Sequence, residues 1–159
     1  MDPLISLTIR NRKPWFVPGE ILDCEYQIDC IGPKAIQAVE ASVLWTTFGK
    51  GDTDLGVHFF ERRIPEDLPE GDLRELHRFQ TVCPESPLSY EGELLSVRWC
   101  VRVRLFPIKG RETSLDIPFQ LGPTSQGGPR RPVRPEVPTA ENNDSQTNSR
   151  RSSTGDDED

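Results

Sequence analysis

Alternation of apolar and polar side chains from Leu95 to Phe106 constrains the fold more than any other stretch of the sequence. Successive side chains of a β-strand point to opposite faces, so this spacing predicts one strand with a buried face and a solvated face. A helix would scatter the same side chains around its axis. The predicted buried face consists of Leu95, Val97, Trp99, Val101, Val103 and Leu105, and the other face of Ser96, Arg98, Cys100, Arg102, Arg104 and Phe106.

Other short alternating runs repeat this pattern along the chain, with turn-forming residues between them. Pro18-Gly19, Gly32-Pro33 and the loop 49–54 separate runs of apolar residues spaced by two. The expected strands are Leu4–Arg10, Glu20–Ile31, Ile36–Phe48, a run with Leu55, Val57 and Phe59 on one face, Leu76–Val82, Leu95–Phe106 and a last run with Leu115, Ile117, Phe119 and Leu121 on one face.

About seven strands without a convincing amphipathic helix predict an all-β fold, an immunoglobulin-like β-sandwich. A parallel α/β architecture is disfavoured because the sequence offers no crossover helices. Pro118 cannot donate a ladder hydrogen bond, so the last strand is expected at an edge or to be locally irregular.

The length of 159 residues suits one domain with a substantial core. We expect residues 1–121 to form the sandwich and residues 122–159 to be a disordered, Pro-rich and then polar and acidic tail. From Gly122 onward large apolar residues are nearly absent, so ordering this segment would cost entropy with little burial to offset it. Within it, Pro129–Arg134 has the P-x-x-P-x-R form of a polyproline ligand.

A net charge of −7 argues against a general nucleic-acid binder, because neutralising phosphates requires a basic surface. No apolar run approaches the length of a membrane span, and no basic start leads into an apolar stretch. We therefore expect a soluble cytoplasmic protein without a cofactor.

The cysteines and histidines give little sign of a reactive or metal-binding centre. Cys24, Cys30, Cys83 and Cys100 lack the paired short spacing of a zinc site, and we expect them to be reduced thiols packed as small apolar groups. Two alternatives stay open at this stage. One is an enzyme with a Cys nucleophile assisted by His58 or His77, and the other is an extracellular immunoglobulin-like adhesion domain with oxidised cysteines.

Two motifs, in this order, carry a family resemblance. Phe16-Val17-Pro18-Gly19-Glu20-Ile21 is similar to the aromatic-x-x-Gly-Glu segment that arrestin-like proteins have before their second strand. Pro84-Glu85-Ser86-Pro87-Leu88-Ser89-Tyr90-Glu91-Gly92, followed by the strand around Trp99, resembles the family's Pro-rich turn and aromatic-centred strand. The chain from about Leu4 to Leu121 thus resembles a single amino-terminal arrestin domain, as a stand-alone member.

The resemblance implies a non-enzymatic adaptor that binds partner proteins or peptides through strands, loops or a sheet edge. In the region where arrestins recognise phosphorylated tails this chain has Arg10, Arg12 and Lys13, which become candidate partner-binding residues. Independently of the resemblance, the polar face of the Leu95–Phe106 strand has two interpretations. Its arginines either pair with carboxylates on neighbouring strands or form a surface for an acidic or phosphorylated peptide, which makes candidates of Arg98, Arg102 and Arg104.

Overall fold

A computed structural model describes residues 2–123 of the chain. Nine strands and one 3₁₀ turn lie in this range, so the all-β prediction is confirmed. The strands are β1 (Leu4–Ile9), β2 (Trp15–Phe16), β3 (Ile21–Asp29), β4 (Ile36–Gly49), β5 (Leu55–Arg63), β6 (His77–Val82), β7 (Tyr90–Glu91), β8 (Leu95–Pro107) and β9 (Thr113–Leu121), and η1 is Pro65–Asp67.

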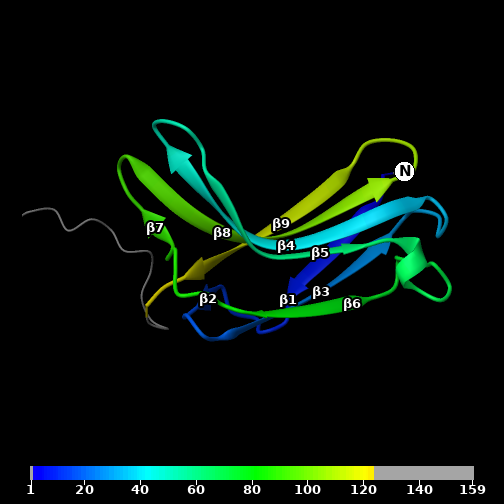
Figure 1. Ribbon diagram of the computed structural model, residues 1–159, viewed down its shortest axis with the longest axis horizontal. Coiled ribbons are helices and arrows are strands. Elements are labelled where there is room, and N and C mark those ends of the chain that lie inside the picture. The colour runs from blue at the N-terminus through cyan, green and yellow to red at the C-terminus, as the bar shows by residue number, and fades with distance from the viewer. Residues whose placement is uncertain (1, 124–159) are drawn as a thin grey trace, which may run out of the picture.

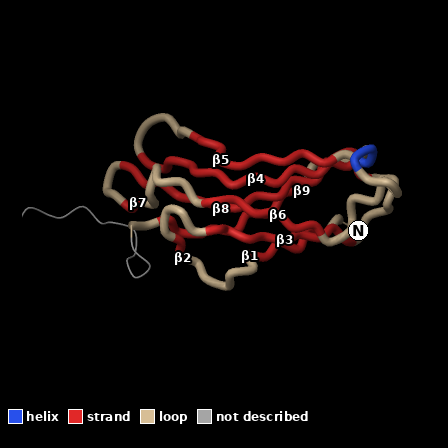
Figure 2. Tube along the Cα trace, turned by 60° about the horizontal axis from the view of Figure 1, so that its bottom comes forward, coloured by secondary structure: helices blue, strands red, loops and turns tan. Residues whose placement is uncertain are grey.

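The strands form two layers of unequal size (Figures 1 and 2). The small sheet has the order β1-β3-β6, and the large sheet has the order β2-β9-β8-β4-β5 with β7 added beside β8. All pairings are antiparallel except that of β2 with β9. The large sheet is curved, with its middle closer to the small sheet than its ends (Figure 1).

The core lies between the two layers and is built from the alternating faces of the long strands. Trp99 is 1% exposed, and its ring lies 5.9 Å from that of Phe119, centroid to centroid. Phe16 packs edge-on against the same Phe119 at 5.7 Å. Burying each large apolar side chain contributes roughly 1.5–3 kcal/mol, so this aromatic group is a main source of stability. Other fully buried core residues are Leu22, Tyr26, Ile28, Ile36, Leu73, Leu105 and Leu121.

The two faces predicted for the Leu95–Phe106 strand are confirmed over most of β8. Trp99, Val101, Val103 and Leu105 are all buried in the core between the sheets. Val97 of the predicted buried face is only half-buried and lies outside the core cluster, and Ser96 of the predicted solvated face is buried. Leu95 is a further exception, because 43% of its surface is exposed. It pairs with Gly49 at the end of the long β4–β8 ladder, and neither residue belongs to the buried cluster.

In β5 the predicted common face of Leu55, Val57 and Phe59 is wrong. The β4–β5 register shifts between Val43 and Leu44, so that Val43 pairs with Phe59 while Leu44 pairs with Val57. An extra residue in one strand reverses the faces beyond it. Phe59 therefore packs against the core, where its ring stacks on Phe79 at 5.2 Å, and Val57 lies on the outer face.

The strand expected at Glu20–Ile31 ends earlier, and this changes the position of one cysteine. β3 ends at Asp29, and Cys30 has a φ of 61°, which interrupts the extended backbone. Cys24 is buried as expected, but Cys30 is exposed, so the prediction that it packs as a small apolar group is wrong. All four cysteines are free.

Two short strands, β2 and β7, are missing from the sequence prediction. β7 pairs with Ser96 and Val97 of β8, which follow it closely in the sequence, whereas β2 is held by contacts with residues distant in the sequence. β2 pairs with the last two residues of β9, and the Gly122 N–H donates to the Phe16 carbonyl at 2.9 Å. Within residues 2–123, β9 has a second neighbour only along these two residues, so its segment around Pro118 borders no second described strand, as expected from the proline.

Candidate interaction surface

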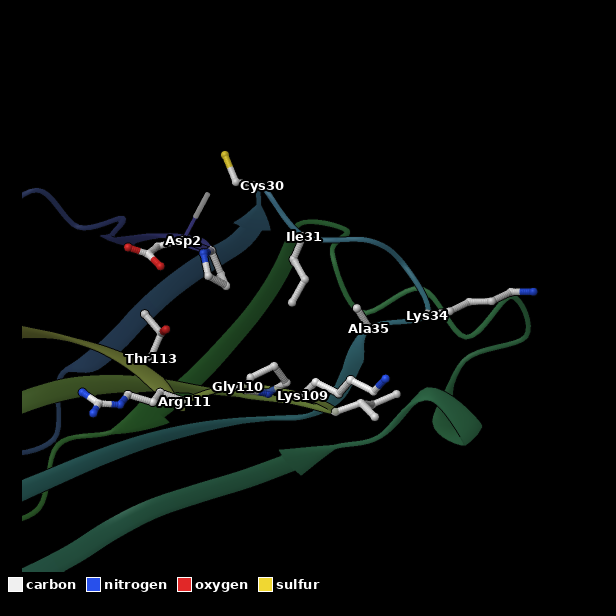
Figure 3. Close-up of a pocket in the computed structure, with 12 residues that line it drawn as sticks. Asp2, Cys30, Ile31, Lys34, Ala35, Lys109, Gly110, Arg111 and Thr113 are labelled. Carbon is white, nitrogen blue, oxygen red and sulfur yellow. The ribbon is translucent and has the colours of Figure 1, made fainter.

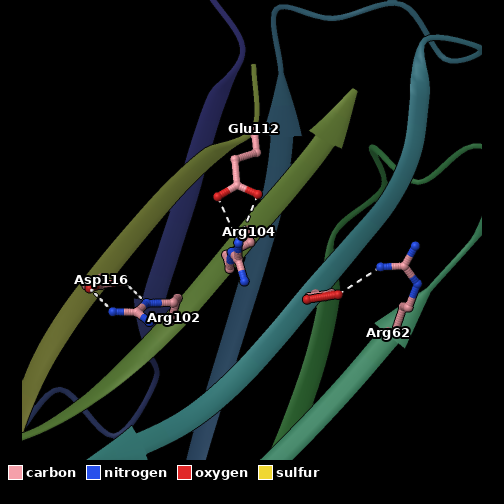
Figure 4. A network of polar contacts seen from close by, with 6 residues as sticks. Arg62, Arg102, Arg104, Glu112 and Asp116 are labelled. Atoms are coloured by element: carbon pink, nitrogen blue, oxygen red, sulfur yellow. Dashed lines mark hydrogen bonds and ion pairs between the residues drawn. The ribbon is translucent and has the colours of Figure 1, made fainter. Parts of the chain in front are cut away.

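The arginines of β8 lie on the outer face of the large sheet, where carboxylates of β9, β7 and the β8–β9 loop pair with them. Figure 4 shows the pairs of Arg102 and Arg104. Arg102 forms a bidentate ion pair with Asp116, in which Nε donates to Oδ1 at 2.8 Å and Nη2 donates to Oδ2 at 3.0 Å. Arg104 donates to both oxygens of Glu112 at 2.8 Å. Arg98 bonds Glu91 at 3.1 Å, and this contact lowers the pKa of Glu91. The interpretation that these arginines pair with nearby carboxylates thus has a structural basis.

The basic residues after the first strand are held in different ways. Arg10 pairs with Asp23 at 2.7 Å, and its Nε lies 3.4 Å from Glu25. Lys13 hydrogen-bonds Glu20, which holds the pKa of that carboxyl below its usual value, with a smaller contribution from the Val17 N–H. Arg12 is exposed, and its side chain makes no polar contact within residues 2–123. These residues do not join the β8 arginines in one site, because they follow β1 of the small sheet.

An apolar row crosses the outer face between the charged rows. The strand register places Val57 of β5, Leu44 of β4, Cys100 of β8 and Pro118 of β9 side by side. Leu44 is only 2% exposed although it lies outside the core cluster. The next row along the strands begins with Phe60, which is 56% exposed, and continues through Ser42 to Arg102. The outer face therefore combines an apolar centre with a charged border.

This apolar row ends at β5, the free edge of the large sheet. β5 is hydrogen-bonded to β4 on one side, and within the described chain no strand pairs with its other side. Leu55 and Val57 are each more than half exposed, like Phe60. Folded proteins usually blunt long edges with charge, proline or a cover, because unpaired N–H and C=O groups accept another strand. Here a nine-residue edge strand exposes apolar side chains next to those groups.

The two histidines connect the edge strand to the small sheet. The His58 Nε2 lies 2.8 Å from the carbonyl oxygen of Val82, and the His77 Nε2 lies 2.6 Å from Glu61. Neither ring has a cysteine among its polar contacts. Burial raises the pKa of Cys24 to about 12 and that of Cys83 and Cys100 to about 11. These three thiols are therefore poor sources of thiolate at neutral pH.

Neither a metal centre nor a membrane-spanning helix is found in the described part of the chain. Residues 2–123 contain no group of three or more histidine, cysteine or acidic side chains placed to hold a metal ion. The same residues form no helix of the length and apolarity needed to cross a bilayer.

Comparison with known proteins gives similarity in fold without similarity in sequence. No protein-family model and no curated protein matches the chain. Among solved structures, the sporulation control protein Spo0M from Bacillus subtilis is similar with a TM-score of 0.53 and 14% sequence identity. The fold is arrestin-like. The similarity covers 75% of this chain and 49% of the Spo0M chain, so the chain spans about half the length of this structural neighbour.

The arrestin-like motifs of the sequence have clear structural roles in this fold. Gly19, at a φ of 88°, forms the turn before β3, and its N–H donates to the Cys83 carbonyl at 2.9 Å. Ser89 exchanges two hydrogen bonds with Leu121, one through its N–H and one through its hydroxyl oxygen. The motifs therefore link distant segments within the sandwich and, by themselves, identify no binding residue.

Sequence reasoning missed the exposed apolar side chains Val57 and Phe60 on the outer face of β5. The pair Phe59-Phe60 was an available signal, because neighbouring residues of one strand point to opposite faces, and a one-sided core can bury only one of them. The position of β5 at the edge had no local signal, since it depends on which strands pair.

Proposed function

We propose that this arrestin-like chain is a non-enzymatic, regulatory protein-interaction module that takes up an extended segment of a partner protein along β5. The observation that carries this proposal is the free edge of β5, with Val57 and Phe60 exposed beside it. An added strand would gain main-chain hydrogen bonds, and its alternate side chains would contact the apolar row of the outer face. Similarity in fold to a sporulation control protein supports the regulatory role at this general level.

The candidate arginines are proposed to act at the border of this surface. Arg102 and Arg104 lie in the same rows as Phe60 and Arg62 of β5, so an acidic or phosphorylated segment on the outer face would meet them. It would compete with Asp116 and Glu112, which already occupy their donors. The role of Arg10, Arg12 and Lys13 in recognising such a segment stays a prediction. Within residues 2–123 the side chains of Arg10 and Lys13 are paired with carboxylates, whereas that of Arg12 makes no polar contact.

Chemical features of the described thiols favour binding over thiol catalysis. Burial raises the pKa of the thiols of Cys24, Cys83 and Cys100. The exposed Cys30 is not among the polar contacts of either histidine ring. Alkylation with iodoacetamide at pH 6 and pH 8 separates the two possibilities. We expect slow, ordinary labelling of Cys30, whereas rapid labelling of any cysteine at pH 6 would favour the enzyme.

Selection from a displayed library of unstructured peptides tests the binding proposal. Selected peptides are titrated into the isotopically labelled full chain, and backbone amide shifts are expected to concentrate on β5. Val57→Lys with Phe60→Lys should weaken binding at least tenfold, since two desolvated apolar contacts are replaced by charges. Leu76→Lys with Leu94→Lys is the matched control, because both leucines are more than half exposed and lie outside β5. Peptides that shift amides elsewhere, or equal losses in both variants, would refute the β5 site.

A further inference from the structure

A second candidate site lies at the end of the sandwich near the amino terminus. The loop between β3 and β4, the loop between β8 and β9 and the residues before β1 enclose a half-open cavity of about 600 Å³ (Figure 3). This volume is in the range of pockets that bind small molecules. The cavity is separate from the β5 edge, because neither β4 nor β5 contributes a strand residue to its lining.

The inner wall of the cavity is apolar and fixed by backbone hydrogen bonds. Ile31 points into it from the end of β3, opposite the β8–β9 hairpin (Figure 3). Ile108 lies in the same lining and is 60% exposed. The Ile108 N–H donates to the Ala35 carbonyl at 2.8 Å, and the Ala35 N–H donates to Gly32 at 3.0 Å. The first bond joins the two loops and the second closes a turn within the β3–β4 loop, so the apolar wall is present before any ligand arrives.

Three cations surround this wall. Lys34, Lys109 and Arg111 all line the cavity, and the side chains of Lys34 and Arg111 point outward in opposite directions (Figure 3). None of their side chains has a polar partner among residues 2–123. In the same part of the chain, most other lysines and arginines are paired, including every arginine of β8.

The charges at the cavity oppose those of the protein as a whole. The chain carries a net charge of −7, yet Asp2 is the only acidic residue among the described lining residues. Its carboxylate lies beside the opening on the same side as Arg111 (Figure 3). Three cations against one carboxylate leave a local positive charge, and unpaired cations next to apolar carbon attract a ligand that has both an anionic group and an apolar body.

We propose that this cavity binds a small organic anion, a carboxylate or phosphate monoester with an aliphatic or aromatic body. The apolar body lies against Ile31, Ala35 and Ile108. The anionic group lies at the opening near Lys109, and Lys34 and Arg111 on either side add to the positive potential that attracts it. The ligand needs both features, because the apolar wall contacts only its body and the cations at the rim attract only its anionic group.

Titration of four probes into the labelled full chain tests this assignment. Hexyl phosphate and hexanoate carry both features, hexan-1-ol carries only the apolar body, and inorganic phosphate carries only the charge. We expect saturable amide shifts at Ile31, Ala35 and Ile108 with the first two probes, at least tenfold weaker binding of the last two, and weaker binding at high salt. Binding of inorganic phosphate as tight as that of hexyl phosphate would overturn the proposal, as would the absence of shifts at these residues.

Matched variants separate a defined site from general attraction by positive charge. The triple variant Lys34→Ala, Lys109→Ala and Arg111→Ala should lose at least tenfold in affinity for hexyl phosphate. The control Lys50→Ala, Arg63→Ala and Arg78→Ala removes the same charge from residues outside the cavity and should change affinity less than twofold. Ile108→Ser should weaken binding of hexyl phosphate and leave that of inorganic phosphate unchanged. Equal losses in the two triple variants would refute the site, and unchanged melting temperatures confirm that each variant folds.

Discussion

The indole N–H of Trp99 donates a hydrogen bond to the backbone carbonyl oxygen of Pro87 at 2.7 Å. Trp99 lies at the centre of β8, and Pro87 belongs to the turn-rich segment before β7, so one side chain holds that segment onto the core. The ring itself is buried against Phe119. Packing and hydrogen bonding thus depend on the same residue, and substitutions can separate them.

Trp99→Ala and Trp99→Phe are expected to differ in cost. The alanine variant creates a cavity in the core and should lose roughly 3–5 kcal/mol of unfolding free energy. The phenylalanine variant keeps most of the apolar contact but leaves the Pro87 oxygen without its donor, which costs about 1–3 kcal/mol. Urea unfolding measures both, with Leu94→Ala as an exposed control. An unchanged stability of Trp99→Ala would contradict the assigned burial.

Gly49→Ala and Gly51→Ala form a matched pair in the β4–β5 connection. Both glycines have positive φ, 149° and 116°, so each alanine variant carries backbone strain. Only at Gly49 would the new Cβ collide with backbone, because it would lie 2.1 Å from the Leu94 carbonyl oxygen, whereas nothing lies within 4 Å at Gly51. We expect Gly49→Ala to be less stable than Gly51→Ala by about 1–3 kcal/mol in thermal or urea unfolding. Equal stabilities would show that the two loops do not approach each other in this way.

The buried thiol of Cys24 predicts a loss of stability in alkaline solution. Its pKa is about 12 in the folded protein, compared with 9.0 for the ordinary thiol, because burial disfavours the thiolate. Above pH 9 the unfolded chain ionises while the folded chain retains its proton, so stability is complete below pH 9 and falls as the pH rises towards 12. At pH 10, ionisation of this thiol in the unfolded chain should lower the free energy of unfolding by ~1 kcal/mol.

Urea unfolding at pH 8, 9 and 10 measures this loss. Cys24→Ala should be less stable at pH 8 because it leaves a small cavity, but its stability should fall less steeply with pH. Parallel slopes for the two proteins would refute the assignment to Cys24.

The Arg102–Asp116 pair permits a charge-reversal experiment on the outer face. Arg102→Glu alone places two acidic side chains opposite each other on neighbouring strands, and we expect a loss of up to about 1 kcal/mol because the pair is partly exposed. Adding Asp116→Arg should restore most of the stability. Binding of selected peptides then answers a separate question. If it stays weak in the restored double variant, the partner needs the guanidinium at position 102, and if it recovers, that residue only supports the fold.

The predicted faces of β8 and the overall sandwich followed from local alternation, because burial of one side of a strand is recorded in every second residue. The faces of β5 could not be obtained in this way. The shift opposite Val43 and Leu44 is a property of two paired strands, and nothing in the sequence of β5 alone marks it. β2 and β7, with two residues each, are too short to show any alternation.

Candidate binding residues were predicted by residue type, which identifies charge but not pairing. The arginines at positions 98, 102 and 104 were found on the expected face, yet their partners Glu91, Asp116 and Glu112 became visible only with the strand order. Lys34, Lys109 and Arg111 are the opposite case, because the sequence did not predict them as binding residues. Lys34 lies far in the sequence from Lys109 and Arg111, and only the meeting of two loops brings all three to one cavity.

The direction of β9 gives the molecule two chemically distinct ends. Thr113, where the strand begins, lines the cavity, and Leu121, where it ends, lies beside β2. Eight residue steps of extended chain separate them by roughly 26 Å. A surface linker or fluorophore attached directly after Leu121 therefore starts at the end of the sandwich opposite the cavity. Protein immobilised through that position can be assayed for binding of small anions.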